Sequence, residues 1–480
     1  GEIDIPNIVI DPKSRDDIPQ LLKGLQFIYT NEPLRDRVFT ILEELMPDRV
    51  GAEGKASRDT GRPGMAQWII LVLGVIRLGL NTDYDRLQEL ANQHSTIRKM
   101  LGHSGWEDET YYELQTLKDN LRLFTPEILE RISQEVVNAG HVALKKSPEN
   151  GLEGRCDSFV VETRVHFPTD TSLLFDAIRK AIETVARLSV DHEITGWRQS
   201  GHLIRRFKSA YRHLQKLRHS TSQDELKRQA KQDELKEATR DYLSLAEGHL
   251  GRIRLTQEAL ASLKEPPSMK ALENYVQHAE RQIDQIRRRV LEGQTIPHQE
   301  KVFSIFQPHT EWVSKGKAGV PVELGLKVCV LEDQHGFILH HQVMEKTTDE
   351  QVAVTITQKA KARFKDLSSV SYDKGFHSPA NQAELQNHVD RVILPKKGRL
   401  SVADQERESD PEFVRLRKRH SAVESAINAL EAHGLDYCPD HGLEGFHRYV
   451  GLAVLARNIQ RLGVVLRENE ALARRGPYKK

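Results

Sequence analysis

Residues 367–376 read Leu-Ser-Ser-Val-Ser-Tyr-Asp-Lys-Gly-Phe. The first six residues predict a short β-strand, and the glycine two residues after Asp373 predicts a turn. We therefore expect Asp373 at the end of a core strand, where its carboxylate would leave the sheet beside that turn.

Two further acidic residues lie in distinct local settings. Asp157 stands in Gly-Arg-Cys-Asp-Ser-Phe-Val-Val-Glu-Thr, whose β-formers predict a strand over about 154–165. Glu424 stands in Arg-His-Ser-Ala-Val-Glu-Ser-Ala-Ile-Asn, which is typical of an amphipathic helix. Three carboxylates from such separate elements would make an all-oxygen site for hard cations, suited to metal-assisted phosphoryl transfer. Glu162 is five residues from Asp157, so alternation along the strand places it on the opposite face.

The elements around these residues predict an α/β core. Strands are expected at 320–331, 337–344 and 391–394, with helices at 348–364 and 378–388, and strands on both sides of helices favour an α/β class. Another amphipathic helix is expected at 451–466. Residues 1–150 read as helical, with a nearly all-apolar helix at 65–80 that we expect to be buried. Its short helices and tight turns are compatible with a helix-turn-helix-like module.

A long helical stretch is predicted over 173–293. Its last arm carries apolar residues at heptad spacing, a seam that needs a partner helix: Leu272, Val276, Ala279, Ile283, Ile286 and Val290. Pro266 and Pro267 separate this arm from the preceding one. A helical hairpin or small bundle follows, and its use as a dimer contact, a DNA clamp or an intramolecular spacer stays open.

Charge is balanced overall but clustered locally. The 480 residues carry a formal net charge of +1, which excludes a globally basic nucleic-acid coat. Local basic clusters suit a protein that follows phosphates along a defined path, although for any single cluster a solvated helix face is the simpler interpretation. The candidate DNA contacts are Arg205, Arg206, Lys208, Lys396, Lys397, Arg399, Arg417, Arg419 and His420.

Several other classes of protein find little support. No stretch resembles a membrane span, because the longest apolar run, 68–80, is interrupted by Gly and Arg. The N-terminus shows no secretory signal, and three widely spaced cysteines favour a reducing compartment. No phosphate-binding glycine loop of the ATPase type is present. Cys438 and His441 match no complete zinc set. Trp197 and Trp312 are candidates for stacking on an unpaired base, with core packing as the alternative.

The three acidic segments resemble the catalytic motifs of DDE transposases of bacterial insertion sequences, most nearly those of ISNCY-type elements. Gly61-Arg-Pro-Gly64 and Gly325-Leu-Lys-Val328 resemble further parts of that group, so the resemblance spans about 60–465. It implies a ribonuclease-H-like core in which Asp157, Asp373 and Glu424 bind Mg²⁺, or Mn²⁺ as a substitute. It also implies binding of terminal inverted repeats, nicking of 3′ ends by water and strand transfer by the freed 3′-hydroxyl.

The sequence departs from this family at two places. Many relatives follow Tyr-x-x-Arg-x-x-x-Glu-x-x-x-x-x-x-Lys, whereas His420 stands at the Arg position and Glu431 at the Lys position. The helical insertion follows Asp157, while better-known relatives carry theirs just before the final Glu. A hairpin-forming mechanism, which depends on that later insertion, is therefore not transferred.

The prediction from sequence is a DNA transposase with an α/β ribonuclease-H-like catalytic core, a helical N-terminal DNA-binding region and a long all-helical insertion. The expected divisions are 1–150 for DNA binding, 151–172 and 296–466 for the core, 173–295 for the insertion, and 467–480 for a basic tail. We expect a homodimer on DNA, no membrane, and a place in the bacterial cytoplasm with the nucleoid. The alternatives are a metal-dependent endonuclease without joining activity and a non-catalytic DNA-binding or architectural protein.

Overall fold

The computed structural model describes residues 4–45, 66–103, 105, 107–146, 149–218, 221–317 and 319–476. The chain divides into two compact units, one formed by residues 1–163 with 313–480 and the other by residues 164–312. The second unit is thus inserted between the first strand of the first unit and the rest of its sheet. The Gly61–Gly64 segment lies outside the described residues.

A single mixed sheet organises the first unit. In the described part of the chain its strands are β1 (Leu152–Thr163), β2 (Glu311–Lys317), β3 (Val320–Glu332), β4 (Ile338–Met344), β5 (Leu367–Tyr372), β6 (Arg391–Ile393) and β7 (Tyr437–Cys438). The strand order is β2-β3-β1-β5-β6, with β4 also paired to β3 and β7 to β1. Strands β3 and β4 are antiparallel, as are β1 and β3, whereas β1, β5 and β6 run parallel.

A glycine allows β1 and β3 to pair closely at one point of the sheet. Gly325 on β3 pairs with Glu162 on β1, and a Cβ on Gly325 would overlap the Val161 carbonyl oxygen. Only glycine lets the two backbones approach so closely there. The strands expected around 154–165, 320–331, 337–344, 367–372 and 391–394 are confirmed, with shifts of at most two residues at their ends.

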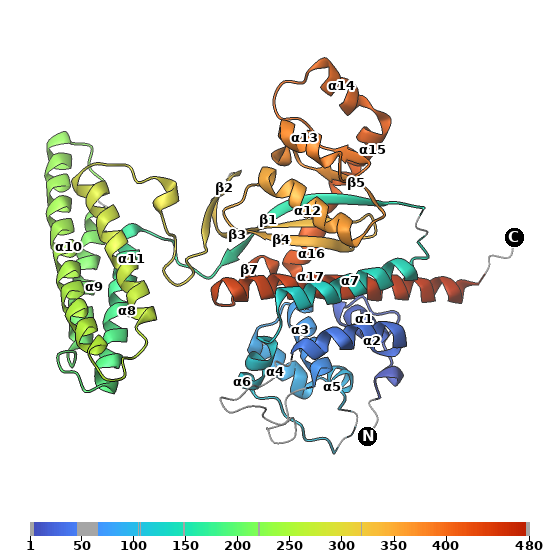
Figure 1. Cartoon of the computed structure of the whole chain (residues 1–480), viewed down its shortest axis with the longest axis horizontal. Helices are drawn as coiled ribbons and strands as arrows, with labels where there is room; N and C mark the ends of the chain where they lie inside the picture. The colour runs from blue at the N-terminus through green and yellow to red at the C-terminus, as the bar shows by residue number, and fades with distance from the viewer. Residues whose placement is uncertain are drawn as a thin grey trace. The chain divides into compact units, whose positions relative to one another are not determined.

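The N-terminal helices share one hydrophobic core with the sheet. They are α1 (Asp17–Thr30), α2 (Glu32–Leu42), α3 (Gln67–Gly79), α4 (Tyr84–Gln93), α5 (Ser95–Met100), α6 (Leu114–Leu121) and α7 (Pro126–Ala143). Helix α3 is buried along nearly its whole length, as its apolar sequence predicted. The long helix α17 (Gly442–Arg475) packs against α1, α3, α7 and β4 and so links these helices to the sheet (Figure 1).

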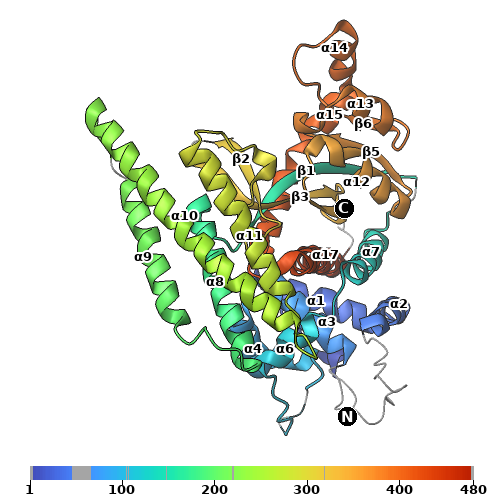
Figure 2. The same ribbon diagram turned by 60° about the vertical axis from the view of Figure 1, so that its left-hand side comes forward.

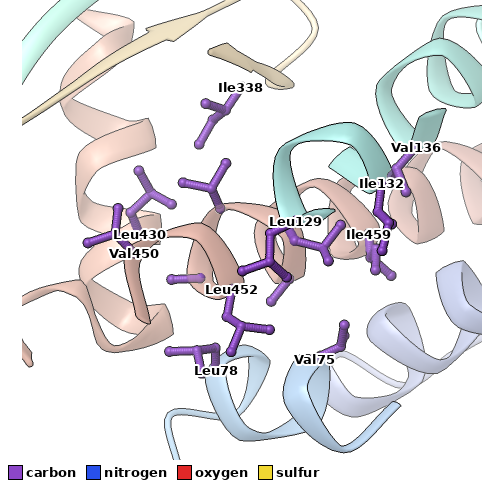
Figure 3. Close-up of a cluster of buried hydrophobic side chains, with 14 of the residues drawn as sticks. Val75, Leu78, Leu129, Ile132, Val136, Ile338, Leu430, Val450, Leu452 and Ile459 are labelled. Atoms are coloured by element: carbon purple, nitrogen blue, oxygen red, sulfur yellow. The ribbon is translucent and has the colours of Figure 1, made fainter. Parts of the chain in front are cut away.

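Figure 3 shows this junction, where Val75 of α3, Leu129 of α7, Ile338 of β4 and Leu452 of α17 contribute to one apolar cluster. Helix α17 differs from the expectation of an amphipathic helix at 451–466, because it runs for 34 residues and is buried on several sides. It also includes much of the segment expected to be a tail, ending at Arg475. Among the described helices it alone is long and apolar enough to cross a membrane, yet 78% of its most apolar window is buried in this core.

The remaining helices of the first unit are α12 (Asp349–Arg363), α13 (Pro379–Leu385), α14 (Val402–Ser409), α15 (Pro411–His420) and α16 (Ala422–Leu430). Helix α12 packs across β3, β4 and β5, and α16 packs on β1. Ser378 caps α13 by accepting a hydrogen bond from the Asn381 amide at 3.1 Å, with Pro379 in the first turn, as expected.

The second unit is a helical bundle with its own core. It contains α8 (Asp170–Asp191), α9 (Ser200–Arg218), α10 (Glu225–Ala261) and α11 (Lys270–Ile286), which lie side by side (Figure 2). The heptad seam of α11 faces α8 within the same unit, and its residues from Leu272 to Ile286 are buried. The seam is therefore covered within the chain, so its use as a dimer contact is not supported by the structure.

Candidate active site

The parallel register of β1 and β5 brings two of the predicted acidic residues to neighbouring positions. Cys156 on β1 pairs with Tyr372 on β5, so the next residue on each strand is Asp157 and Asp373, respectively. Residues at matching register on adjacent strands point to the same face of a sheet. Strands β1 and β5 are neighbours in the sheet (Figure 1). The two carboxylates, separated by more than 200 residues in sequence, therefore leave it at neighbouring positions.

Helix α16 supplies the third acidic residue. Val423, Ala426 and Leu430 form its buried face, which packs towards β1, and Glu424 is exposed on the adjoining face. The charge of Glu424 reaches Asp157, where it helps raise the pKa of that carboxyl group. The three residues thus share one electrostatic environment.

The carboxyl group of Asp157 has a raised pKa. Burial raises its pKa to about 6, and the negative charges of Asp373, Asp349 and Glu424 add to the effect. The Ser158 amide donates a hydrogen bond to Asp157 Oδ1 at 2.8 Å, and this bond lowers the pKa and so opposes the increase. Among the described side chains, no ion pair neutralises Asp157, Asp373 or Glu424. These three carboxylates therefore lie together without an ion-pair partner among the described residues.

A fourth carboxylate, which the sequence did not single out, lies within this group. Asp349, the first residue of α12, accepts a hydrogen bond from Ser158 Oγ at 2.5 Å and lies 3.6 Å from Lys327 Nζ. A Cβ on Gly375 would lie 3.2 Å from Asp349 Oδ2 and 3.9 Å from Asp373 Oδ2. The two carboxylates thus flank Gly375, which explains why a residue without a side chain suits the Asp-Lys-Gly turn.

The donor chemistry fits a hard cation. Carboxylate oxygens are the ligands that Mg²⁺ and Mn²⁺ prefer, and the unpaired negative charge favours a divalent ion. In the described residues, however, no three His, Cys, Asp or Glu side chains converge closely enough to form a ready-made coordination shell. The acidic residues share the site, but their side chains would have to close in on an ion to bind it.

His420, the last residue of α15, lies at the edge of this acidic group. Its Nδ1 forms a 2.8 Å hydrogen bond with Ser371 Oγ on β5. Burial lowers the pKa of His420, while the charges of Asp373 and Glu424 act in the opposite direction. The ring is therefore neutral near pH 7, and it does not supply the positive charge that an arginine would bring to this position.

The basic candidates near the sheet are largely engaged within the protein. Lys396 pairs with Asp404 at 2.6 Å, Lys397 lies 3.9 Å from Glu350, Arg417 lies 3.4 Å from Glu408 and Arg419 lies 3.4 Å from Glu153; Arg399 is exposed. The basic side chain of each pair is partly exposed, so a phosphate could reach it, although the carboxylates of Asp404 and Glu408 are nearly buried.

The basic candidates on α9 differ from those near the sheet. Arg205, Arg206 and Lys208 are exposed, and none of them forms an ion pair with a described residue. Arg212 and Lys216 on the same helix are also exposed, and the helix contains no acidic residue. In the second unit, α9 thus presents a run of positive charge that the protein itself does not neutralise.

Other candidates from the sequence have structural roles. Cys438 is buried next to Asp440, whose carboxylate forms a two-bond ion pair with the buried Arg77 at 2.6 and 3.1 Å. Trp197 is buried and donates a hydrogen bond to Thr256 Oγ1 at 2.9 Å. Glu162 lies towards the other end of β1, where burial and the charge of Glu323 raise its pKa.

Glu431 lies near Glu323 and Lys315, as Glu162 does, and not in the acidic group around Asp157. Burial raises its pKa, and the charge of Lys315 lowers it. The residue that occupies the family's Lys position therefore brings a carboxylate near Glu323 and Lys315, and no positive charge.

Comparison with known proteins finds a family similar to one part of this chain. Residues 284–459 match the family model described as the transposase DDE domain. The matched segment includes Asp373 and Glu424, whereas Asp157 precedes it. No curated protein and no solved structure matches the chain. Residues 284–459 are thus similar to a transposase DDE domain, and such a domain implies a ribonuclease-H-like fold that is consistent with the mixed sheet.

Proposed function

We propose that this protein is a DNA transposase that binds the terminal inverted repeats of its element, nicks their 3′ ends and joins them to target DNA. The observation that carries the proposal is the group of unpaired carboxylates at Asp157, Asp373 and Glu424 in a chain with a transposase DDE domain. The negative charges in such a group repel one another, and a bound divalent cation would reduce that repulsion.

Asp157, Asp373 and Glu424 would hold Mg²⁺, with Mn²⁺ as a substitute. When bound, such ions would supply Lewis acidity to the attacking and leaving oxygens of a phosphodiester. The protein's own contribution is to hold the carboxylate oxygens on β1, at the end of β5 and on α16. Asp349 accepts a hydrogen bond from the hydroxyl of Ser158, the residue after Asp157, and would thereby help to position Asp157.

DNA would reach the site along positively charged surfaces. Helix α9 offers exposed cations that form no ion pair with a described residue, and we assign them to phosphate contacts: Arg205, Arg206, Lys208, Arg212 and Lys216. Lys396, Lys397, Arg399, Arg417, Arg419 and His420 are assigned to the DNA near the active site, where Lys396 and Arg417 would exchange their carboxylate partners for phosphates.

Processing of two element ends requires two active sites, so we propose a homodimer assembled on DNA in the bacterial cytoplasm. The α11 seam is covered by α8, and the dimer contact therefore has to lie elsewhere. The N-terminal helices are proposed to bind the terminal repeats.

A joining assay tests this function. The full chain is incubated with Mg²⁺, target DNA and duplexes of the element ends that already carry a free 3′-hydroxyl. A transposase yields joined strands, whereas an endonuclease without joining activity yields none.

Asp157→Asn separates catalysis from binding. It should abolish nicking and joining while end binding stays within a few-fold, and Glu162→Gln on the same strand serves as the matched control with activity retained. Unchanged cleavage by Asp157→Asn would leave the architectural alternative standing and eliminate the assignment of the three carboxylates.

A further inference from the structure

A cavity in the 164–312 unit belongs to none of the sites described above. Its volume is about 600 Å³, within the range of small-molecule pockets. The start of α8, the end of α11 and the segment from Gln294 to Trp312 enclose it, so it lies wholly inside one compact unit.

Gln282 of α11 is the unusual residue of the cavity wall. Its side chain is only 1% exposed, and neither its Nε2 donor nor its Oε1 acceptor has a hydrogen-bond partner. The neighbouring Gln285 is satisfied, because its Nε2 donates to the Glu300 carbonyl oxygen at 2.7 Å. Leaving both amide atoms of Gln282 unpaired costs stability, a cost that a bound ligand offering one acceptor and one donor would remove.

Aromatic side chains form another part of the wall. The Trp312 ring lies 5.6 Å from the Phe167 ring and 5.7 Å from the Phe303 ring, measured between centroids. Phe167 is 66% exposed, an unusual degree for a large apolar side chain next to a cavity. These rings offer surfaces on which a flat ligand could stack.

The charges of the wall favour a ligand with an anionic part. Asp170 is already paired with Arg289 at 2.6 Å, so the carboxylate is not free to bind a cation. Lys301 is exposed, and no ion pair with a described residue engages it. A flat ring with a donor and an acceptor on one edge, attached to a phosphate, matches the wall better than a lipid or a metal ion.

We propose that this cavity binds a nucleobase. The base would stack against the rings of Phe167, Trp312 and Phe303, its edge would pair with the Gln282 amide, and Lys301 would contact the attached phosphate. An amide that both donates and accepts matches the edge of adenine well. The base could come from an unpaired position of a DNA strand or from a free mononucleotide; the first source, which we favour, rests on the proposed function.

Binding measurements on the full chain test the proposal without metal and without catalysis. Saturation with dAMP and with labelled single-stranded oligonucleotides is measured for the wild type, Gln282→Leu, Phe167→Ala and the control Gln229→Leu, which changes an exposed glutamine of α10. We expect Gln282→Leu and Phe167→Ala to weaken binding by about tenfold or more and the control to leave it unchanged.

The outcomes separate the two sources of the base. Loss of oligonucleotide binding alone identifies a base of a DNA strand, and loss of dAMP binding alone identifies a free nucleotide. Unchanged binding of both probes overturns the proposal.

Thermal unfolding adds a readout that a purely structural glutamine would not give. Gln282→Leu should raise Tm in the absence of ligand, because it removes two unpaired buried atoms. A lowered Tm with unchanged binding would show that Gln282 only supports the fold. Because neither measurement requires cleavage, a failure here is distinct from a failure of the transposase assignment, which the joining assay reports.

Discussion

Replacement of Asp157 by Asn should stabilise the metal-free protein while it abolishes catalysis. The pKa of Asp157 is raised from 3.8 to about 6 because the ionised carboxylate is buried among other negative charges. One pKa unit corresponds to about 1.4 kcal/mol, so ionised Asp157 costs the folded state about 3 kcal/mol at neutral pH. Asn keeps the shape and the acceptor for the Ser158 amide without the charge.

The pH dependence of this difference has a defined sign. Below pH 3.8 Asp157 is protonated in both the folded and the unfolded chain, and its charge costs nothing. As pH rises from about 4 to about 6, the unfolded chain loses its proton first, so the wild type loses stability relative to Asp157→Asn. Above about pH 6 the difference stays at its full value.

Thermal unfolding between pH 4.5 and 8 measures this effect. At pH 7.5 without metal, the Tm of Asp157→Asn should exceed that of the wild type by roughly 5 °C. Addition of Mg²⁺ should raise the Tm of the wild type and close the gap, because the cation offsets the charge of Asp157. An equal or lower Tm for Asp157→Asn at every pH would refute the reasoning that this carboxylate is held under electrostatic strain.

Three further predictions address the neighbouring features. Asp349→Asn should reduce cleavage by about tenfold or more while DNA binding is retained, because Asp349 holds the Ser158 hydroxyl beside Asp157. Cleavage at the wild-type rate would show that Asp349 is not part of the active site. Replacement of Arg205, Arg206 and Lys208 by Glu should weaken DNA binding. It should also reduce the slope of log affinity against log salt concentration by about 3 on duplex DNA. An unaltered slope would count against a DNA role for α9. Arg77→Met should lower the free energy of unfolding in urea by about 3–5 kcal/mol, since it leaves Asp440 without its partner, whereas the exposed Arg86→Met should cost less than about 1 kcal/mol.

Local patterns were sufficient to predict the framework of the site. The β-formers after Asp157, and the strand and glycine turn around Asp373, predicted the two strands that the parallel register then joins. The amphipathic pattern around Glu424 predicted the helix α16 with its buried apolar face. These predictions succeeded because the apolar residues of a strand or helix with one buried face recur at the spacing of that element.

Features that depend on tertiary contacts were not predictable. Asp349 reads as an ordinary acidic residue in the first turn of a helix, and only the packing of α12 brings it to Ser158. The heptad seam of α11 showed that a partner helix was needed, but its spacing could not tell α8 of the same chain from a second protomer. The unpaired amide of Gln282 is likewise invisible in the sequence, because its surroundings come from segments far apart along the chain.

Binding of Mn²⁺ to the full chain, followed by electron paramagnetic resonance in the presence of an element end, tests the central claim most directly. Wild-type protein should bind Mn²⁺ at the acidic site, and Asp157→Asn, Asp373→Asn and Glu424→Gln should each lose that binding while Glu162→Gln retains it. Mn²⁺ binding with the same stoichiometry and affinity in all three variants would contradict the assignment of these carboxylates as one metal site.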